Sequence, residues 1–349
     1  MNPADSQLRQ EIYQQPAVLE RLLRSQGAAV DELVRTMKKT GIRHVVIAAR
    51  GTSDNAGRFA QYLLGAMNGL VVALATPSLF TYYARPPQLR DALVLGISQS
   101  GRSPDIVAVL AEARRQGALT AVLSNAVDSE LAAQGDIVVD LCAGEERAVA
   151  ATKTYTAELA AIALLSARLA GDTEMAEALA RLPEAVSVAL GQDGAAARAA
   201  ARLQGIRYAA VIGRGFNYAS AFELALKIKE LSYISTEAYS SADFRHGPLA
   251  IIEPDFPVIV IAAAGPLLAD MRSLMRTLEE RRATVLCISD DPETAGGAGA
   301  VIVVPPQVPE WLSPATLIVP GQLLAMHMAE LRGYDVDAPR SIRKITETY

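Results

Sequence analysis

Short apolar runs alternate with longer amphipathic segments along most of the chain, and this alternation predicts an α/β fold. The apolar runs are bounded by turn residues, which is typical of parallel strands buried on both faces. We expect strands at 43–49, 70–75, 92–97, 118–123, 136–141, 207–212, 257–262, 283–288 and 300–304. Helical patterns cover 16–39, 54–68, 103–116, 152–170, 173–190, 216–232, 266–281 and 320–332. The pattern predicts doubly wound parallel sheets in a three-layer α/β/α arrangement.

Two sets of these strands repeat at a nearly constant spacing along the chain. The matching segments are Arg50-Gly51 with Arg214-Gly215, Ser124-Asn125 with Ser289-Asp290, and Ile137-Val138-Val139 with Ile302-Val303-Val304. We interpret the chain as two tandem copies of one α/β unit. The expected boundaries are 1–40 for an N-terminal helical segment, 41–190 and 191–333 for the two domains, and 334–349 for a tail.

Composition narrows the possible partners. The 349 residues are 51% hydrophobic, enough for a large core, and the net charge of −5 argues against nucleic-acid or anionic-membrane surfaces. Trp311 to Ala329 is uncharged, but prolines interrupt it, so we expect a buried helix starting at Pro320 and no membrane span. With no recognisable signal peptide, the chain is expected to be soluble and cytoplasmic, without nucleic-acid or membrane partners.

The two cysteines, Cys142 and Cys287, each end an apolar run. Their spacing fits neither a metal site nor a disulfide framework, so we expect buried thiols in a reducing compartment, no metal and no cofactor. Gly213-Arg214-Gly215 does not indicate a dinucleotide, because Tyr218 stands where the third glycine of that fingerprint would be.

A candidate anion site follows the strand at 92–97. Ser103 is placed to cap a helix that has Pro104 at its first position, and three hydroxyls, an amide and Gly101 precede that helix. A helix N-terminus with short polar side chains is suited to hold an anion, although an ordinary serine-rich turn has the same pattern. The second copy has Ala262-Ala263-Ala264-Gly265 here, so we expect one phosphate site per chain.

The carboxyl end of the first strand leads into Thr52 and Ser53. Ligands of open parallel sheets bind at this edge, so these hydroxyls would face the same crevice. The alternative is that Ser53 or Asp54 only caps the helix that follows.

Candidate acid–base groups lie in the second copy. Glu223, Lys227 and Glu230 share one helix face. They form either a solvated ion-pair ladder or part of a site, because the semi-polar segments up to Tyr239 lead directly into a possible active loop. His246 lies in a Gly-Pro loop and is a candidate for proton transfer, whereas His44 and His327 are expected to be structural.

Together these segments resemble the double sugar isomerase (SIS) fold of the isomerase half of glucosamine-6-phosphate synthase, from about residue 40 to the end. The segments that carry the resemblance are Gly51-Thr52-Ser53, Ser98 to Ser103, Ala150 to Lys153, Glu223 to Tyr233, Arg245 to Pro248 and Asp337 to Lys344. The resemblance implies tandem SIS units that bind a phosphorylated sugar.

It also implies a role for each matched residue. The phosphate would be bound by Ser98, Gln99, Ser100 and Ser103, and the sugar would be lined by Thr52 and Ser53. Glu230 would move a proton between C1 and C2, with Lys227 beside it. Ala151 stands where the synthase pattern has a hydroxyl, so one sugar contact would be lost or made by backbone.

Two further groups would complete the site. His246 would open the sugar ring in the neighbouring subunit's site, which implies a homodimer. Lys344 would cover the site and form an imine with the open-chain ketose.

Met1 leads directly into helices with no N-terminal cysteine nucleophile, so we expect no release of ammonia from glutamine. The resemblance then favours a deaminase, which converts glucosamine 6-phosphate and water to fructose 6-phosphate and ammonia. The ending Lys344-Ile345-Thr346-Glu347-Thr348 resembles single-chain deaminase-like members. The alternatives are deglycation of a fructosamine phosphate by the same chemistry, and a non-catalytic sugar-phosphate sensor.

Overall fold

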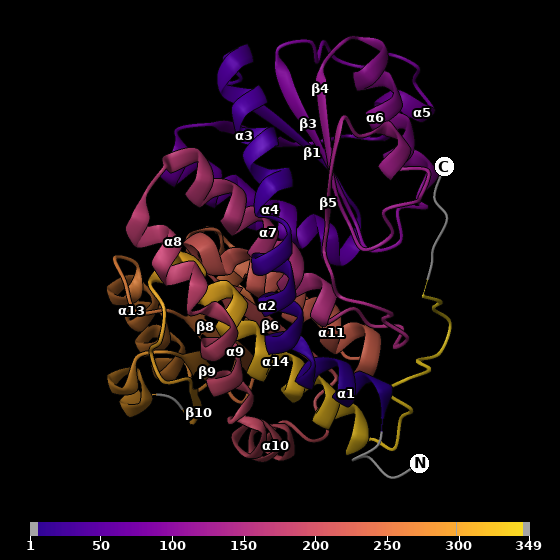
Figure 1. The fold of residues 1–349 in the computed structure, drawn as a ribbon. Coiled ribbons are helices and arrows are strands. Elements are labelled where there is room, and N and C mark those ends of the chain that lie inside the picture. Colours follow the sequence, from indigo (N-terminus) through magenta and orange to yellow (C-terminus); the bar gives the residue numbers. More distant parts are fainter. Residues whose placement is uncertain (1–5, 298, 345–349) are drawn as a thin grey trace. The chain divides into compact units, whose positions relative to one another are not determined.

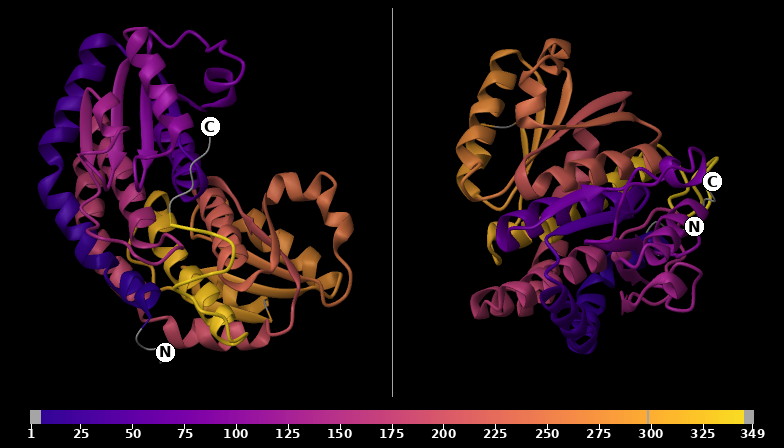
Figure 2. Two further views of the ribbon diagram at one scale, coloured as in Figure 1. Left: turned by 90° about the vertical axis from the view of Figure 1, so that its right-hand side faces the viewer. Right: turned by 90° about the horizontal axis from the view of Figure 1, so that it is seen from above.

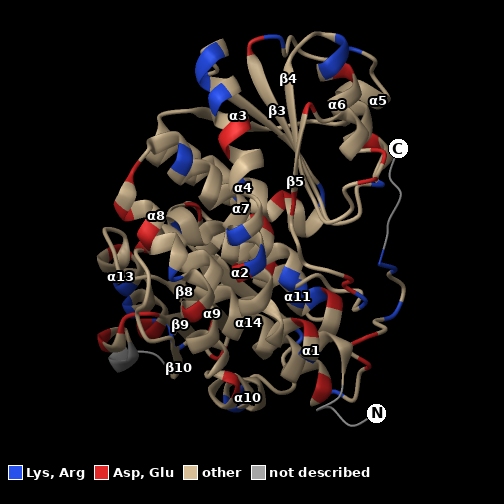
Figure 3. Ribbon diagram, viewed as in Figure 1, with Lys and Arg blue, Asp and Glu red and all other residues tan. Residues whose placement is uncertain are grey.

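The computed structural model describes residues 6–297 and 299–344, which form two compact units. Ala17–Glu146, Lys153–Ala180 and the tail from Arg343 form the unit that contains strands β1 to β5, here called the β1–β5 unit. The chain up to Pro16, Arg147–Thr152 and Arg181–Ile342 form the β6–β10 unit. Acidic and basic residues are interspersed along the helices of both units (Figure 3).

The β1–β5 unit contains a five-stranded parallel sheet of order β2-β1-β3-β4-β5 (Figure 1). The strands are β1 (His44–Ala48), β2 (Val71–Leu74), β3 (Ala92–Ser98), β4 (Leu119–Ser124) and β5 (Ile137–Asp140). All seven residues of the central strand β3 are buried, as the continuous apolar run predicts. The order reverses direction between β1 and β3, and this switch point is where ligands of such sheets bind.

Helices cover both faces of this sheet. They are α2 (Gln15–Ser25), α3 (Gly27–Thr40), α4 (Gly51–Asn68), α5 (Ser78–Thr81), α6 (Pro104–Arg115), α7 (Lys153–Ala170) and α8 (Thr173–Ala180), with a short 3-10 turn η2 (Ala132–Gln134). On one face Ile106, Val109 and Leu110 of α6 pack on Val94 and Val122 of the sheet. α4 packs on the strands and on α7, and α3 packs on α7 and β5.

The β6–β10 unit has the equivalent strand order, β7-β6-β8-β9-β10, again all parallel. Its strands are β6 (Tyr208–Gly213), β7 (Ser235–Ser240), β8 (Pro257–Ala262), β9 (Thr284–Ser289) and β10 (Ala300–Val303). The expectation of a tandem doubly wound α/β fold is therefore confirmed. No strand was expected at Ser235–Ser240, which forms the edge strand β7.

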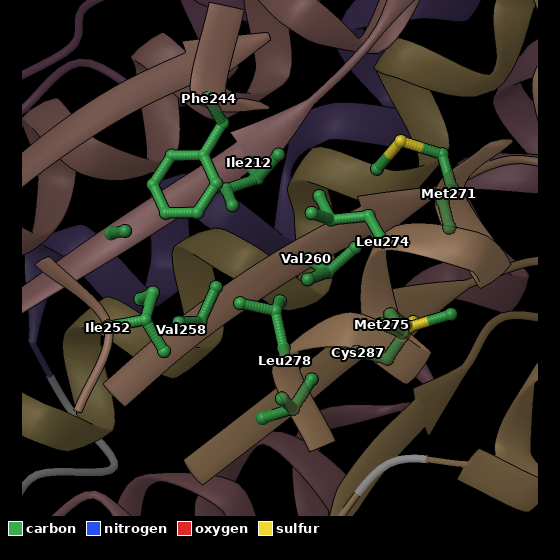
Figure 4. Close-up of a cluster of buried hydrophobic side chains, with 13 residues drawn as sticks. Ile212, Phe244, Ile252, Val258, Val260, Met271, Leu274, Met275, Leu278 and Cys287 are labelled. Atoms are coloured by element: carbon green, nitrogen blue, oxygen red, sulfur yellow. The ribbon is translucent and has the colours of Figure 1, made fainter. Parts of the chain in front are cut away.

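The helices of this unit are α1 (Gln7–Tyr13), α9 (Leu182–Leu190), α10 (Asp193–Arg202), α11 (Tyr218–Ser232), α12 (Ser241–Arg245), α13 (Leu268–Glu280) and α14 (Ser313–Glu330). Short 3-10 turns are η3 (Gly215–Asn217), η4 (Pro248–Ile251), η5 (Pro292–Gly297) and η6 (Glu310–Leu312). Figure 4 shows Phe244 of α12 and Met271, Leu274 and Leu278 of α13 packed on one face of the sheet, around Val260. Figure 2 gives two further views of the strands and helices of each unit.

Strand register tests the internal repeat. In the first copy Val94 of β3 pairs with Val46 of β1. At the spacing that relates Arg50 to Arg214, their counterparts are Val258 and Ala210, and these two residues also pair. Ser124 ends β4 and accepts a hydrogen bond from the amide of Ala126, and Ser289 ends β9 and accepts one from the amide of Asp291. The first two matches are structurally equivalent.

The third match is wrong in its register. In the first copy Ile137 pairs with Ala121. At the spacing of this match, their counterparts in the second copy are Ile302 and Leu286. Leu286, however, pairs with Ala300 and not with Ile302. The connection before β10 is therefore shorter than the spacing implied, and the similar Ile-Val-Val runs are offset in the sheets.

Several helix boundaries differ from the predictions. The expected helix 16–39 is interrupted at Gln26, whose side-chain oxygen accepts a hydrogen bond from the amide of Asp140 at the end of β5. The expected helix 173–190 breaks at Arg181, because Pro183 cannot donate a backbone hydrogen bond there.

The helix expected at 320–332 is α14, which begins at Ser313 and contains Pro320 in its interior. Among the described residues, no helix has both the length and the apolar character needed to cross a membrane. Cys287 is buried, as expected, but Cys142 is only half-buried and has a positive φ of 53°.

Candidate active site

In the β1–β5 unit, the turn after β3 forms a compact polar structure at the switch point. The Ser98 hydroxyl accepts a hydrogen bond from the amide of Gly101 at 3.0 Å, and Gly101 has a φ of 63°. The carbonyl of Gly101 accepts a hydrogen bond from the amide of Leu131 at 3.1 Å. Side chain and backbone together therefore fix the turn before any ligand binds.

The start of α6 follows this turn as expected. Ser103 is the N-cap residue and Pro104 is at the first helical position, although the Ser103 side chain makes no capping hydrogen bond. Gln99, Ser100 and Ser103 are half-buried. The short polar side chains and the positive end of α6 are thus combined in a way that suits an anion.

Next to this turn, α4 begins at Gly51 with Arg50 as its N-cap residue, so neither Ser53 nor Asp54 is the N-cap. Thr52 is half-buried and Ser53 is buried. The Ser53 hydroxyl donates to a carboxylate oxygen of the buried Glu158 on α7 at 2.6 Å. Ser53, expected to line the sugar, therefore also has an internal hydrogen-bond acceptor.

Arg50 spans the switch point. Its Nε and Nη2 atoms lie 2.8 and 2.7 Å from one carboxylate oxygen of Asp105, in the first turn of α6. Asp105 is 1% exposed at its side chain, whereas that of Arg50 is half exposed. The guanidinium both neutralises the buried acid and adds positive charge beside the Ser98–Ser103 turn.

The tail lysine meets a buried acid of the same unit. Lys344 Nζ lies 2.8 Å from Glu146 Oε2, and the Glu146 side chain is fully buried. Glu146 also accepts hydrogen bonds from the amide and the hydroxyl of Thr154, at 3.2 and 2.8 Å. The Lys344 side chain is 22% exposed. Residues 345–348, which carried the comparison of the chain's ending, lie outside the described residues.

In the β6–β10 unit, Glu223, Lys227 and Glu230 of α11 form a buried ion-pair ladder. Lys227 Nζ lies 2.5 Å from Glu230 Oε2 and 3.5 Å from Glu223 Oε1. The side chains of Lys227 and Glu223 are 1% and 0% exposed, and that of Glu230 is 23% exposed. The alternative of a solvated ladder is therefore wrong, because only the last carboxylate reaches the surface.

His246 is exposed, directly after α12, as the loop interpretation expects. Its backbone is fixed by a hydrogen bond from its amide to the carbonyl of Asp243 at 3.0 Å. The next residue, Gly247, has a φ of 132°, a conformation that side chains disfavour. The imidazole is therefore carried by a well-defined backbone.

Helix α1 forms hydrogen bonds with two other segments of this unit, the one before Ala151 and the tail at Asp337. The buried Glu11 accepts hydrogen bonds from the amides of Arg147 and Ala148 at 2.5 and 3.2 Å, which fixes the segment that leads to Ala151. At the start of α1, Asp337 of the tail accepts from the amides of Gln7 and Leu8.

The tail also contacts the end of α11. The amide of Arg340 donates to the Tyr233 hydroxyl at 2.7 Å, and its guanidinium lies 4.0 Å from the centre of the Tyr233 ring. Tyr233 directly follows α11, so the tail up to Arg340 is docked close to the end of the helix that carries the Glu230 carboxylate.

In the second copy, carboxylates of the chain lie at the position that corresponds to the anion site. The amide of Ala264 donates to Asp290 at 2.6 Å, and a methyl group placed on Gly265 would lie 2.7 Å from the Glu310 carboxylate. Burial raises the pKa of Glu310, and the charge of Asp290 raises it further. Carboxylates of the chain thus occupy the place where an anionic ligand would bind in the first copy.

Sequence reasoning missed the acids and bases that support these groups, among them Arg50, Asp105, Glu146 and Glu158. The internal repeat was an available signal for one pair, because Arg214 and Asp270 stand in the second copy where Arg50 and Asp105 stand in the first. Within residues 6–297 and 299–344, no cluster of three or more His, Cys, Asp or Glu side chains could hold a metal ion.

Comparison with known proteins identifies the family. The SIS domain model matches residues 40–168 and 203–332, so the chain belongs to the SIS domain family. A glutamine–fructose-6-phosphate aminotransferase of Zymomonas mobilis is 35% identical over 353 residues, covering 97% of this chain. The chain spans 58% of the length of that relative.

Solved structures agree on the fold. The C-terminal domain of the glucosamine-fructose-6-phosphate aminotransferase of Francisella tularensis is 27% identical, with a TM-score of 0.88 over 96% of this chain and 98% of that domain. A glucosamine-6-phosphate deaminase of Thermotoga maritima is 22% identical, with a TM-score of 0.78 over 98% of this chain and 100% of the other.

Proposed function

We propose that the chain is a glucosamine-6-phosphate deaminase, which converts glucosamine 6-phosphate and water to fructose 6-phosphate and ammonia. The observation that carries the proposal is the ladder on α11, where the buried Lys227 holds the partly exposed carboxylate of Glu230 at 2.5 Å. A carboxylate supported in this way is suited to abstract a proton from carbon and to return it.

The reaction needs one proton shift and one hydrolysis. Glu230 takes the proton from C2 of the open-chain sugar, and the electron pair forms a C1–C2 double bond as the aldehyde oxygen is protonated. Return of the proton to C1 leaves an imine at C2, as the amine nitrogen gives up one proton in place of the proton taken by the aldehyde oxygen. Water adds to this imine and ammonia leaves, so atoms and charges balance.

The remaining groups receive roles from their positions. The Ser98–Ser103 turn and the start of α6 bind the phosphate, with Gln99, Ser100 and Ser103 half-buried around it. Thr52 and Ser53 line the sugar, and the backbone at Ala151 replaces a missing hydroxyl. Lys344 covers the site and condenses reversibly with the C2 carbonyl of the ketose, which forms an imine and releases one water that hydrolysis of the imine takes up again. Glu146 balances the charge of Lys344 when no sugar is bound.

We further propose that the chain acts as a homodimer. His246 is exposed directly after α12, next to Gly247 with its positive φ, and an exposed imidazole suits a group that opens the sugar ring in the partner's site. A strictly monomeric preparation that retained full activity would contradict this arrangement.

The names of the relatives support an amino sugar phosphate as substrate. The Zymomonas and Francisella proteins are named for fructose 6-phosphate, and the Thermotoga protein for glucosamine 6-phosphate. The groups that we assign to deamination lie within residues 6–344.

The test is release of ammonia from glucosamine 6-phosphate by the chain and by Glu230→Gln. Glu237→Gln is the matched control, because Glu237 is an exposed carboxylate of the same unit. We expect Glu230→Gln to lose roughly a thousandfold in kcat while the control keeps full activity. Equal rates for wild type and Glu230→Gln would refute the proposed base, and tight sugar-phosphate binding without turnover by wild type would indicate a sensor.

A further inference from the structure

Each copy of the fold has an ion pair across its own switch point. In the first copy Arg50 binds Asp105, and in the second Arg214 Nη1 lies 2.7 Å from Asp270 Oδ2. In each copy the arginine precedes the first helix after the sheet's first strand, and the acid lies in the first turn of α6 or α13. Gly51 and Gly215, which follow the arginines, have φ values of 55° and 59°.

The second copy adds one partner to this pair. Arg245 Nη1 lies 2.9 Å from Asp270 Oδ1, and Arg245 Nη2 donates to the backbone carbonyl of Asp270 at 3.1 Å. At the spacing that relates Arg50 to Arg214, the first copy has Thr81 in the place of Arg245, and the Thr81 hydroxyl donates locally to the carbonyl of Pro77. The added contact therefore distinguishes the copy that carries His246.

Asp270 also binds the other end of α12. The hydroxyl of Ser241, the first residue of the helix, donates to Asp270 Oδ2 at 2.6 Å. Arg245, the last residue of the helix, returns a hydrogen bond to the carbonyl of Ser241 at 3.2 Å. One carboxylate thus holds both ends of a five-residue helix.

Apolar packing also fixes this helix. Phe244 is fully buried against Ile212, Val258 and Val260 (Figure 4). The hydrogen bonds to Asp270, in contrast, hold Arg245, the residue directly before His246. A helix of one turn has little stability of its own, so these tertiary contacts set its orientation.

We propose that Asp270 is a positioning residue for His246, acting through Arg245 at the end of α12. The inference rests on the proposed function, since it assigns a purpose to the orientation of His246. Burial raises the pKa of Asp270, but hydrogen bonds from Ser241, Arg214 and Arg245 outweigh this effect and lower the pKa overall. The carboxylate therefore stays ionised at neutral pH and holds two arginines that would otherwise repel each other.

The experiment compares wild type with Asp270→Asn and Asp270→Glu. Arg272→Gln is the matched control, because it breaks another ion pair on α13, between Arg272 and Asp291, without contacting α12. The chain has three histidines, so imidazole NMR signals can be assigned with His246→Ala. The readouts are the His246 signals and the kcat and KM for ammonia release from glucosamine 6-phosphate.

We expect Asp270→Asn to shift or broaden the His246 signals, leave those of His44 and His327 unchanged, and lower kcat roughly tenfold with KM within about twofold. Asp270→Glu should restore most of the kcat, and Arg272→Gln should match wild type. If Asp270→Asn leaves both the His246 signals and kcat unchanged, the inference is wrong.

The NMR readout separates this inference from the proposed reaction. A wild-type chain without ammonia release, but with His246 signals that move only in Asp270→Asn, would refute the deaminase and support the positioning role. Normal ammonia release by wild type, with His246 signals and kcat that do not change in Asp270→Asn, would support the deaminase and refute the positioning role.

Discussion

Lys227 holds its ammonium 2.5 Å from the carboxylate of Glu230 while its own side chain is 1% exposed. A buried lysine is costly unless its charge is compensated, and here Glu223 and Glu230 both compensate it. The arrangement fixes the Glu230 side chain at the one position of the ladder that solvent reaches. Replacing Lys227 should therefore change both the free energy of unfolding and the rate of ammonia release.

Replacing Lys227 by methionine should destabilise the protein by about 3 kcal/mol, because two carboxylates then lose their shared cation. It should also lower kcat, since Glu230 is no longer held. Urea unfolding measures the first effect and ammonia release the second. Lys229→Met is the control, because Lys229 is exposed on the same helix. A loss no greater than that of Lys229→Met would contradict the importance of the ladder.

Gly101→Ala should abolish binding of sugar phosphate. Gly101 has a φ of 63°, and an added methyl group would overlap the Ser129 side chain, so the turn must move. Gly144 has the same φ of 63° but no atom within 4 Å of that position. Gly144→Ala should therefore cost only the backbone strain, about 1 kcal/mol, and retain binding.

Calorimetric titration with glucosamine 6-phosphate distinguishes the two alanine variants. Equal affinity in both would mean that the turn after β3 is not the phosphate site. Equal loss in both would point to backbone strain alone, with no specific part for the Ser98–Ser103 turn.

His327 should make stability depend on pH above neutrality. Burial lowers the pKa of His327, but hydrogen bonds to Glu330 and Asp193 outweigh it and raise the pKa above 6.5. Protonated His327 therefore stabilises the fold fully below about pH 6.5, and this contribution is lost as the pH rises through the raised pKa.

We expect the free energy of unfolding to fall over that range by at most about 1.4 kcal/mol per pH unit from this group. His327→Gln should remove this slope, whereas His44→Gln, at an exposed strand start, should keep it. Urea unfolding at several pH values measures it. A slope that survives in His327→Gln would assign the effect to other groups.

Lys344 should be trapped as an adduct with a ketose phosphate. Borohydride reduces an imine to a stable amine, so treatment with fructose 6-phosphate should attach the sugar to Lys344, detectable by peptide mass spectrometry. Lys344→Arg keeps the charge next to Glu146 but cannot form the imine. An adduct at other lysines that persists in Lys344→Arg would remove Lys344 from this role.

The sheets were predictable from sequence because central parallel strands are buried on both faces. Strands such as β3 and β8 are almost continuous apolar runs, whereas the edge strand β7 consists mostly of polar residues and was missed. Helix breaks such as that at Gln26 depend on a contact with Asp140, far away in the chain, which no local pattern encodes.

The same division holds for the candidate site. The Ser98–Ser103 turn and the Glu223–Lys227–Glu230 spacing are local patterns and were found. The partners of the charged groups were not, because Arg50 is distant in sequence from Asp105, and Lys344 still more distant from Glu146. The convergence of both sets of residues on one sugar stays a prediction.

The most direct test of the account is the fate of the C2 hydrogen during turnover of glucosamine 6-phosphate that carries deuterium at C2. If Glu230 moves this hydrogen, wild type removes the deuterium from C2 and delivers it to C1 of fructose 6-phosphate, or to water where the Glu230 carboxyl exchanges with solvent, and Glu230→Gln removes none. Removal of the deuterium by Glu230→Gln at the wild-type rate, or binding of the sugar without any loss of deuterium from C2 by wild type, would contradict the account.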